Sequence, residues 1–349
     1  MRGSLTQLVK IEAKKLGFSL TGVTTPDPPP HWSTFENWLT LGRNASMDYL
    51  AADRSIQRRA DPLRILPECR SILVLGMRYP SPLTVDKMNL QHPTGRIAAF
   101  ACGEDYHLVL PKLLEELIVF IRSQVGYFFQ YRCYTDTGPI LERDLAQRAG
   151  LGWIGKNTCL IHPQQGSYFL LAEILLGIQL DIDRPFEPDR CGTCTRCIQA
   201  CPTGCILPDR TLDSSRCLSF LSIEMKSSIP LELRPFMGNW VFGCDLCQLV
   251  CPWNRFATTG SKVGLLKRQV DPDPILLDEL ALSAQGFNIK YKNTALMRAR
   301  HSRYLRNVIV ALVNSGFSRD NLLVLERLMV DPDPLIKEHA AWAVERWKQ

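Results

Sequence analysis

Eight cysteines in the second half of the chain have the types and spacing of ligands for iron–sulfur clusters. Four stand as C-x2-C-x2-C-x3-C directly before a proline, a run in which close thiolates hold one cluster and the last reaches another. A second, stretched set also ends in Cys-Pro. The two sets are Cys191, Cys194, Cys197, Cys201 and Cys217, Cys244, Cys247, Cys251. The sequence therefore predicts two 4Fe-4S clusters.

The same pattern predicts how the thiolates divide between the clusters, because each run in a two-cluster protein lends its last cysteine to the other cluster. One set is then Cys191, Cys194, Cys197 and Cys251, and the other is Cys201, Cys217, Cys244 and Cys247. The alternative is a pair of zinc sites, although zinc ribbons use two C-x2-C pairs rather than three successive cysteines.

The other five of the 13 cysteines lie in apolar or mixed segments, which favours inert buried thiols. They are Cys69, Cys102, Cys133, Cys159 and Cys205. Disulfides are not expected, because lysines and a glutamate occupy the place of an apolar signal segment and no stretch is long and apolar enough to cross a membrane. We expect a soluble, cytoplasmic protein.

Asp136 is the acidic residue best placed for chemistry. It follows a strand-like segment, residues 127–134, and precedes a helical one, residues 139–148, at the kind of strand end where ligand clefts form. A helix N-cap is the alternative role, because Asp before Thr-Gly-Pro suits that position. Spacing alone favours the cap.

Two further motifs are weaker. Gly150, Gly152 and Gly155 match G-x-G-x-x-G, but a dinucleotide fingerprint follows a strand and opens a helix, and here the order is reversed. These glycines therefore predict a tight, packed turn. Asp105 and His107 begin like a corrinoid D-x-H-x-x-G motif that lacks its glycine, which indicates a helix start with a surface histidine.

A basic run near the C-terminus could contact nucleic acid. Between residues 288 and 306 there are six lysines and arginines and no acidic residue, together with two tyrosines. The basic residues are Lys290, Lys292, Arg298, Arg300, Arg303 and Arg306. Such a run predicts contacts with phosphates, and a solvated helix face is the alternative.

The elements that must position these residues indicate three domains in 349 residues. Helices alternate with strands, among them a buried strand at residues 71–77 and a helix at 105–124, which favours an α/β or α+β layered domain, and we expect α/β over residues 1–185. The cysteines of residues 186–257 form a ferredoxin-like domain. Apolar stripes over 258–349 predict a helical, HEAT-like repeat region, so the overall class is α+β.

Four segments together resemble the epoxyqueuosine reductases. They are residues 136–143 (DTGPILER), residues 150–157 (GLGWIGKN), the double cysteine run and residues 217–224 (CLSFLSIE). The resemblance implies a cytoplasmic, cobalamin-dependent iron–sulfur enzyme that removes the epoxide oxygen of epoxyqueuosine at the wobble position of tRNA. An external low-potential electron donor and an anticodon stem-loop are the implied partners, and we expect a monomer.

The resemblance also implies roles for individual residues. Asp136 would be the proton donor, and burial beside an apolar corrin face could raise its pKa for that purpose. The implied cobalamin contacts are Arg59, Asp136, Lys156, Asn157, Ser219, Ser222 and Asp245. The chain departs from the family pattern at Gly138, where alanine is usual, and at Phe100, where a tyrosine is common.

Two other functions remain open at this point. A reductive dehalogenase shares the corrinoid and cluster plan, but the basic helices argue against a small-molecule substrate. A ferredoxin-like electron carrier would need no aspartate at a strand end and no long N-terminal domain.

Overall fold

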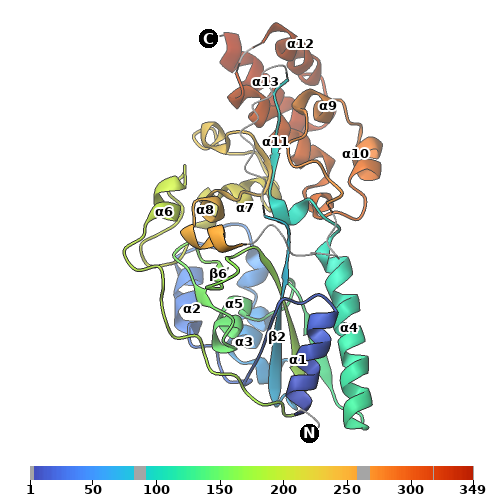
Figure 1. Ribbon diagram of the computed structural model, residues 1–349. Coiled ribbons are helices and arrows are strands. Elements are labelled where there is room, and N and C mark those ends of the chain that lie inside the picture. The colour runs from blue at the N-terminus through green and yellow to red at the C-terminus, as the bar shows by residue number, and fades with distance from the viewer. Residues whose placement is uncertain (1–3, 82–91, 258–267, 317, 349) are drawn as a thin grey trace.

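The computed structural model describes residues 4–81, 92–257, 268–316 and 318–348 (Figure 1). The strands are β1 (Leu20–Thr24), β2 (Ser71–Arg78), β3 (Arg96–Ile97), β4 (Tyr131–Tyr134), β5 (Trp153–Ile154), β6 (Leu160–Ile161), β7 (Phe169–Leu176) and β8 (Trp240–Phe242). The helices are α1 (Leu5–Lys15), α2 (Trp32–Thr40), α3 (Asp53–Ala60), α4 (Tyr106–Val125), α5 (Glu142–Arg148), α6 (Arg196–Ala200), α7 (Leu218–Ile223), α8 (Leu246–Leu249), α9 (Leu276–Leu280), α10 (Ala284–Lys290), α11 (Arg300–Asn314), α12 (Arg319–Leu328) and α13 (Pro334–Lys348).

A four-stranded sheet in the order β1-β2-β7-β4 forms the centre of the N-terminal part. Successive residues of β2 alternate between two apolar cores, so that Leu73 packs under α1 and α4 while Val74 packs under α5. Both faces of the strand are buried, which explains why its sequence reads as an uninterrupted apolar run. Figure 1 shows the sheet between these helices.

The strand directions in this sheet correct the predicted α/β class of the N-terminal part. Every neighbouring pair in it is antiparallel, so the N-terminal part is α+β rather than the α/β domain that alternating helices and strands suggested. Sequence order does not reveal strand direction here, because β2 pairs with the distant β7 instead of with a strand reached by a single helical crossover. The predicted α+β class of the whole chain agrees with this mixed content.

The predicted glycine turn is confirmed. The segment lies between α5 and β5, in the helix-turn-strand order that excludes a dinucleotide fingerprint. Gly152 has a φ of 151°, and a Cβ on it would lie 2.2 Å from the carbonyl oxygen of Ile161. The glycines therefore let β5 and β6 approach closely.

A segment of the N-terminal part crosses into the rest of the molecule. β3 pairs in parallel with β8, and Ile97 joins the apolar core formed mainly by α9, α11 and α13. The backbone N–H of Asp105 donates to the carbonyl of Asn293 at 2.8 Å. The three predicted domains therefore share contacts through this segment, and the last predicted boundary adjoins residues 258–267, which lie outside the described residues.

The C-terminal part is helical. α11 is buried along most of its length and packs against α9 and α13, and α12 packs against α13. Assignment of these helices to HEAT-like repeats stays a prediction. Within the described ranges, no helix has both the length and the apolar character needed to cross a membrane.

Candidate active site

A solvent-open cleft of about 460 Å³ lies beside α2, α3 and the loop that follows β4. One wall is aromatic, with Phe35 stacked on Trp38 at 5.9 Å between ring centroids. Arg59 and Asp136 bring charged groups to the same cleft. An apolar wall with a few placed polar groups is typical of a cofactor or substrate site.

Asp136 occupies a left-handed backbone conformation with a φ of 58°. Its N–H donates to the Glu142 Oε1 at 2.5 Å, and its side chain is 57% exposed at the cleft. The helix α5 begins six residues later and has Leu141 at its N-cap position. The alternative role as a helix cap is therefore wrong, and the carboxylate is available for chemistry.

His107 links Asp136 to a second aspartate. The Nε2 of His107 lies 3.1 Å from the Asp136 Oδ2, and its Nδ1 lies 2.8 Å from the Asp105 Oδ1. Desolvation acts to lower the pKa of His107, but hydrogen bonds to the two carboxylates outweigh it and raise the pKa to about 9. At neutral pH the imidazole is protonated and donates from both nitrogens.

The pKa of Asp136 is correspondingly lowered. Desolvation acts to raise it, but the hydrogen bond and positive charge of His107 dominate, and the charge of Arg298 adds to them. The rise in this pKa that burial beside a corrin face could cause stays a prediction, and the sequence did not reveal that the cationic His107 lies beside the carboxylate. The proton of the Asp136–His107 pair resides on the imidazole.

Of the other predicted cobalamin contacts, Arg59 lines the cleft as well. Arg59 donates to the carbonyl of Gly138 at 3.4 Å, beside Asp136. Lys156 and Asn157 line the cavity of the first cysteine set instead. Ser219 is half-buried and does not line the cleft as the described residues define it.

Ser222 and Asp245 require a correction. Ser222 is 0% exposed, donates to Leu218 and accepts from Gly243. Asp245 is 1% exposed and accepts from the N–H of Ala99 at 2.7 Å. Ser222 supports the backbone of the cysteine-rich segment, and Asp245 holds the backbone of Ala99, so direct contact with a ligand in the cleft is contradicted for both side chains.

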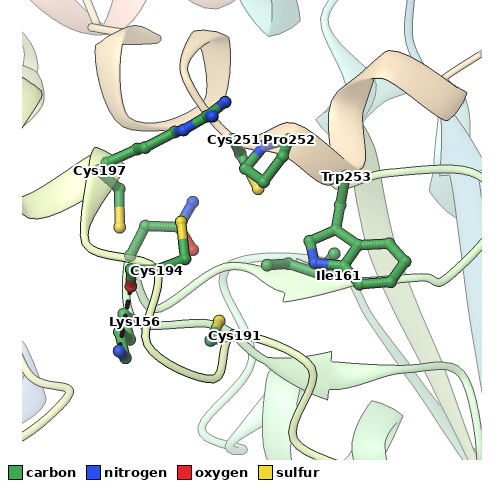
Figure 2. Close-up of a pocket in the computed structure, with 10 residues that line it drawn as sticks. Lys156, Ile161, Cys191, Cys194, Cys197, Cys251, Pro252 and Trp253 are labelled. Carbon is green, nitrogen blue, oxygen red and sulfur yellow. Dashed lines mark hydrogen bonds between the residues drawn. The ribbon is translucent and has the colours of Figure 1, made fainter.

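The structure gathers the first predicted cysteine set around one cavity. The thiols of Cys191, Cys194, Cys197 and Cys251 face a common space, as Figure 2 shows, whereas Cys201 does not line it. The indole N–H of Trp153 donates to the Cys191 Sγ at 3.4 Å, and Lys156 holds the loop through the carbonyls of Gly192 and Cys194.

The second cysteine set has two additional thiols beside it. The Sγ of Cys205 lies 3.4 Å from that of Cys201, and Cys159 is hydrogen-bonded to Cys247. These two thiols therefore differ from the expectation that most of the remaining cysteines are inert core thiols, because they contact predicted ligands. For Cys205 the four-residue spacing from Cys201 was an available signal.

The geometry does not favour the zinc alternative. No three or more His, Cys, Asp or Glu side chains within the described ranges are gathered closely enough for one metal ion. A cubane holds its thiolates at its corners, farther apart than the ligands of a single zinc ion. The first cysteine set, which surrounds one cavity, fits the larger group.

The cleft and the cysteines are connected. Thr158 lines the cleft and is followed directly by Cys159, while the Asn157 side chain donates to the carbonyl of Cys247. Asn157 also lines the cavity of the first set, so one short segment touches the cleft and both groups of thiols. Such continuity suits electron transfer from the first set through the second to the cleft.

Four residues of the basic run are exposed: Lys290, Lys292, Arg298 and Arg300. Two of these form ion pairs, Lys290 with Glu279 and Arg298 with Glu224. Arg303 is half-buried and donates to the carbonyl of Ile223 at 3.0 Å.

Arg306 does not belong to the exposed run. It is 0% exposed, and its guanidinium donates to the carbonyls of Leu221, Met225 and Ser227. Its predicted contact with phosphate is therefore wrong, because the periodicity of α11 turns this residue into the core.

A charged cleft joined to a double set of cluster cysteines defines an iron–sulfur oxidoreductase. Residues 190–254 match a family model described as "4Fe-4S double cluster binding domain", and residues 59–137 match "Epoxyqueuosine reductase QueG, DUF1730". The chain is 36% identical to the epoxyqueuosine reductase of Pseudomonas aeruginosa over 98% of its own length and 94% of that protein. It therefore belongs to the epoxyqueuosine reductase family.

Other comparisons agree. The epoxyqueuosine reductase of Escherichia coli strain K12 is 37% identical over 97% of this chain and 89% of that protein. A crystal structure of epoxyqueuosine reductase with an epoxyqueuosine-modified tRNA-Tyr stem loop superposes with a TM-score of 0.89, at 31% identity, over 98% of this chain and 90% of that one. The enzyme from Bacillus subtilis superposes with a TM-score of 0.88, at 31% identity, over the same shares of the two chains.

Proposed function

We propose that this protein reduces epoxyqueuosine to queuosine at the wobble position of tRNA, with two 4Fe-4S clusters, cobalamin and Asp136 as the proton donor. The observation that carries the proposal is the cleft in which Asp136 and Arg59 lie beside the thiol-bearing segment at Cys159. Family membership favours this activity over a dehalogenase or a simple electron carrier. A related enzyme binds an epoxyqueuosine-modified stem loop.

The residues present fit both kinds of cofactor. Each cluster would take one of the two cysteine sets, and cobalamin would lie in the cleft, where the Phe35–Trp38 wall suits an apolar macrocycle. Arg59 is 7% exposed and would meet the polar amide periphery. Lys156, Asn157 and Ser219 remain predicted contacts. When bound, cobalamin supplies a strongly reducing, nucleophilic cobalt.

Asp136 and His107 would supply a proton to the substrate. Opening an epoxide leaves an alkoxide, which a positioned acid can neutralise. His107 holds a proton 3.1 Å from the Asp136 carboxylate, and Asp105 fixes the imidazole from the other side. Asp136 thus delivers a proton that His107 can replace. In the Bacillus subtilis enzyme an aspartate lies on a catalytic loop that can swing out of the active site.

The RNA would lie across the mouth of the cleft and the exposed part of the basic run. Arg298 is close enough to Asp136 for its charge to lower the pKa of that carboxyl. Lys292 and Arg300 extend the positive surface away from the cleft, with Lys290 and Arg303 beside them. A single-stranded anticodon loop can splay a base into such a pocket.

Replacing Lys292 and Arg300 together with glutamine should weaken tRNA binding. Each phosphate contact that is lost should flatten the dependence of log K on log salt by roughly 0.7. Binding titrations at several salt concentrations measure both quantities. Unchanged affinity and slope would show that this surface is only solvated.

Arg306→Gln is the matched control. The substitution removes the guanidinium and leaves buried carbonyl groups without their hydrogen-bond donor. It should therefore lower the free energy of unfolding by on the order of 3 kcal/mol. Folded Arg306→Gln protein should keep the wild-type salt slope. A weaker salt dependence of tRNA binding in Arg306→Gln would show that Arg306 does contact the RNA.

Reconstitution tests the whole function. The anaerobic protein with rebuilt clusters should change its absorption spectrum when cobalamin is added, and it should convert epoxyqueuosine-containing tRNA after reduction. Omitting cobalamin should abolish conversion. Cluster reduction without turnover would support an electron carrier, and turnover of an aryl halide in place of the tRNA would support a dehalogenase.

A further inference from the structure

Cys205 is a buried thiol that no step of the proposed function uses. Its side chain is 3% exposed, and its Sγ lies 3.4 Å from the Sγ of Cys201. A second hydrogen bond joins its side chain to that of Cys217. Cys201 and Cys217 both belong to the second predicted cysteine set. One additional thiol therefore contacts two sulfur atoms that the sequence assigns to the same cluster.

A tight turn holds Cys205 against Cys201. The N–H of Gly204 donates to the carbonyl of Cys201 at 3.1 Å, and Gly204 adopts the left-handed backbone with a φ of 63°. On the other side, the N–H of Asp213 donates to the carbonyl of Cys205 at 2.9 Å. The backbone is hydrogen-bonded on both sides of the contact, so the turn itself places the two sulfur atoms together.

The proton in this contact belongs to Cys205 once a cluster is bound. A cluster ligand is a thiolate, which can accept a hydrogen bond but has no proton to donate. The Cys201 Sγ also accepts from the backbone N–H groups of Thr203 and Cys205, so its surroundings are those of an acceptor. A buried thiol that binds no metal keeps its proton at neutral pH. Cys205 is therefore the donor.

Hydrogen bonds to ligand sulfurs are one of the means by which a protein sets the reduction potential of a cluster. Reduction adds negative charge to the cluster, and a donor at a ligand sulfur stabilises the reduced form more than the oxidised form. The potential therefore rises. The hydroxyl of Thr203 lies 3.6 Å from the Cys201 Sγ and acts in the same direction.

We propose that the Cys205 thiol raises the reduction potential of the second cluster by donating a hydrogen bond to the thiolate of Cys201 or of Cys217. An electron that enters through the first set is then held on the second cluster. That cluster adjoins the cleft, because Cys159 contacts its predicted ligand Cys247 and follows directly on Thr158. The inference rests on the proposed function, because it assumes that the second set binds a cluster on the path of the electrons.

Cys205→Ala removes the donor and leaves all eight predicted ligands in place. With both clusters rebuilt anaerobically, redox titration followed by electron paramagnetic resonance measures the two midpoint potentials. One midpoint should move to a more negative value, so that less than half of that cluster is reduced at the wild-type midpoint. Cys205→Ser, whose hydroxyl can still donate, should recover part of the shift. Both variants should keep the wild-type iron content.

Cys69→Ala is the matched control. Cys69 is also a buried thiol, but it donates to the carbonyl of Ser71 at 3.4 Å and not to a predicted ligand. Its replacement removes a thiol of the same size from the core. Both midpoint potentials should therefore stay at their wild-type values.

Proteins that hold a single cluster assign the shift. Cys194→Ser with Cys251→Ser should keep only the second cluster, and adding Cys205→Ala should move its midpoint to a more negative value. Cys244→Ser with Cys247→Ser should keep only the first cluster. In that protein the same alanine substitution should have no effect.

The outcomes separate this inference from the proposed function. Unchanged midpoints in fully loaded Cys205→Ala would refute the role of the thiol, and so would a serine variant that behaves like the alanine variant. Loss of half of the iron from Cys205→Ala would also overturn it, because Cys205 would then be a ligand. If the midpoint shifts as expected but wild-type enzyme does not convert epoxyqueuosine-containing tRNA, the proposed function fails and the inference stands.

Discussion

Asp136→Asn should load both clusters and cobalamin but turn over about 10²- to 10⁴-fold more slowly, the usual contribution of a general acid. Asparagine suits the test because it tolerates the left-handed backbone at this position, where φ is 58°. It can also still accept a hydrogen bond from His107, but it has no carboxylic proton to give. Single-turnover assays with pre-reduced enzyme and epoxyqueuosine-containing tRNA isolate the step.

The matched control is Asp331→Asn, which changes an aspartate that accepts a turn hydrogen bond between α12 and α13. That variant should keep the wild-type rate. Near-normal turnover in fully loaded Asp136→Asn would remove Asp136 from the chemistry and leave His107 as the candidate acid.

Cys251→Ser should lose one cluster, so that iron content falls to half and turnover stops. The interleaved assignment makes a sharper prediction for double variants. Cys194→Ser with Cys251→Ser removes two ligands of the same cluster and should still retain half of the iron. Cys194→Ser with Cys201→Ser removes a ligand from each cluster and should retain almost none.

Iron analysis and electron paramagnetic resonance measure these outcomes. The Cys201 variants need a Cys205→Ala background, because the Cys205 thiol lies 3.4 Å from Cys201 and could take its place. If the first four cysteines instead share one cube, the iron contents of the two double variants will be exchanged.

Local sequence signals predicted the parts of the site that depend on short spacing. The cysteine runs, the glycine turn before β5 and the helix α4 could be located because their determinants lie within a few residues of one another. The Gly126 at φ 74° that ends α4 follows the predicted helix closely.

The features of the site that the sequence did not predict depend on tertiary packing. His107 meets Asp136 only because the start of α4 and the end of β4 converge, and the positive charge of the imidazole then lowers the pKa of Asp136. Arg306 was assigned to the surface because a run of charge in sequence does not show which way each residue faces.

The hydrogen bond from Asp105 to Asn293 also has a consequence for biosynthesis. The carbonyl of Asn293 accepts the N–H of Asp105, but the ribosome adds Asn293 long after Asp105. In the same way, β3 cannot pair with β8 until β8 has been synthesised. At about 5 to 20 residues per second, the delay between Asp105 and Asn293 is roughly 10 to 40 s. During that interval the nascent chain contains both aspartates and the histidine but lacks Asn293, whose carbonyl supports Asp105, so this cluster can reach its final arrangement only late in synthesis.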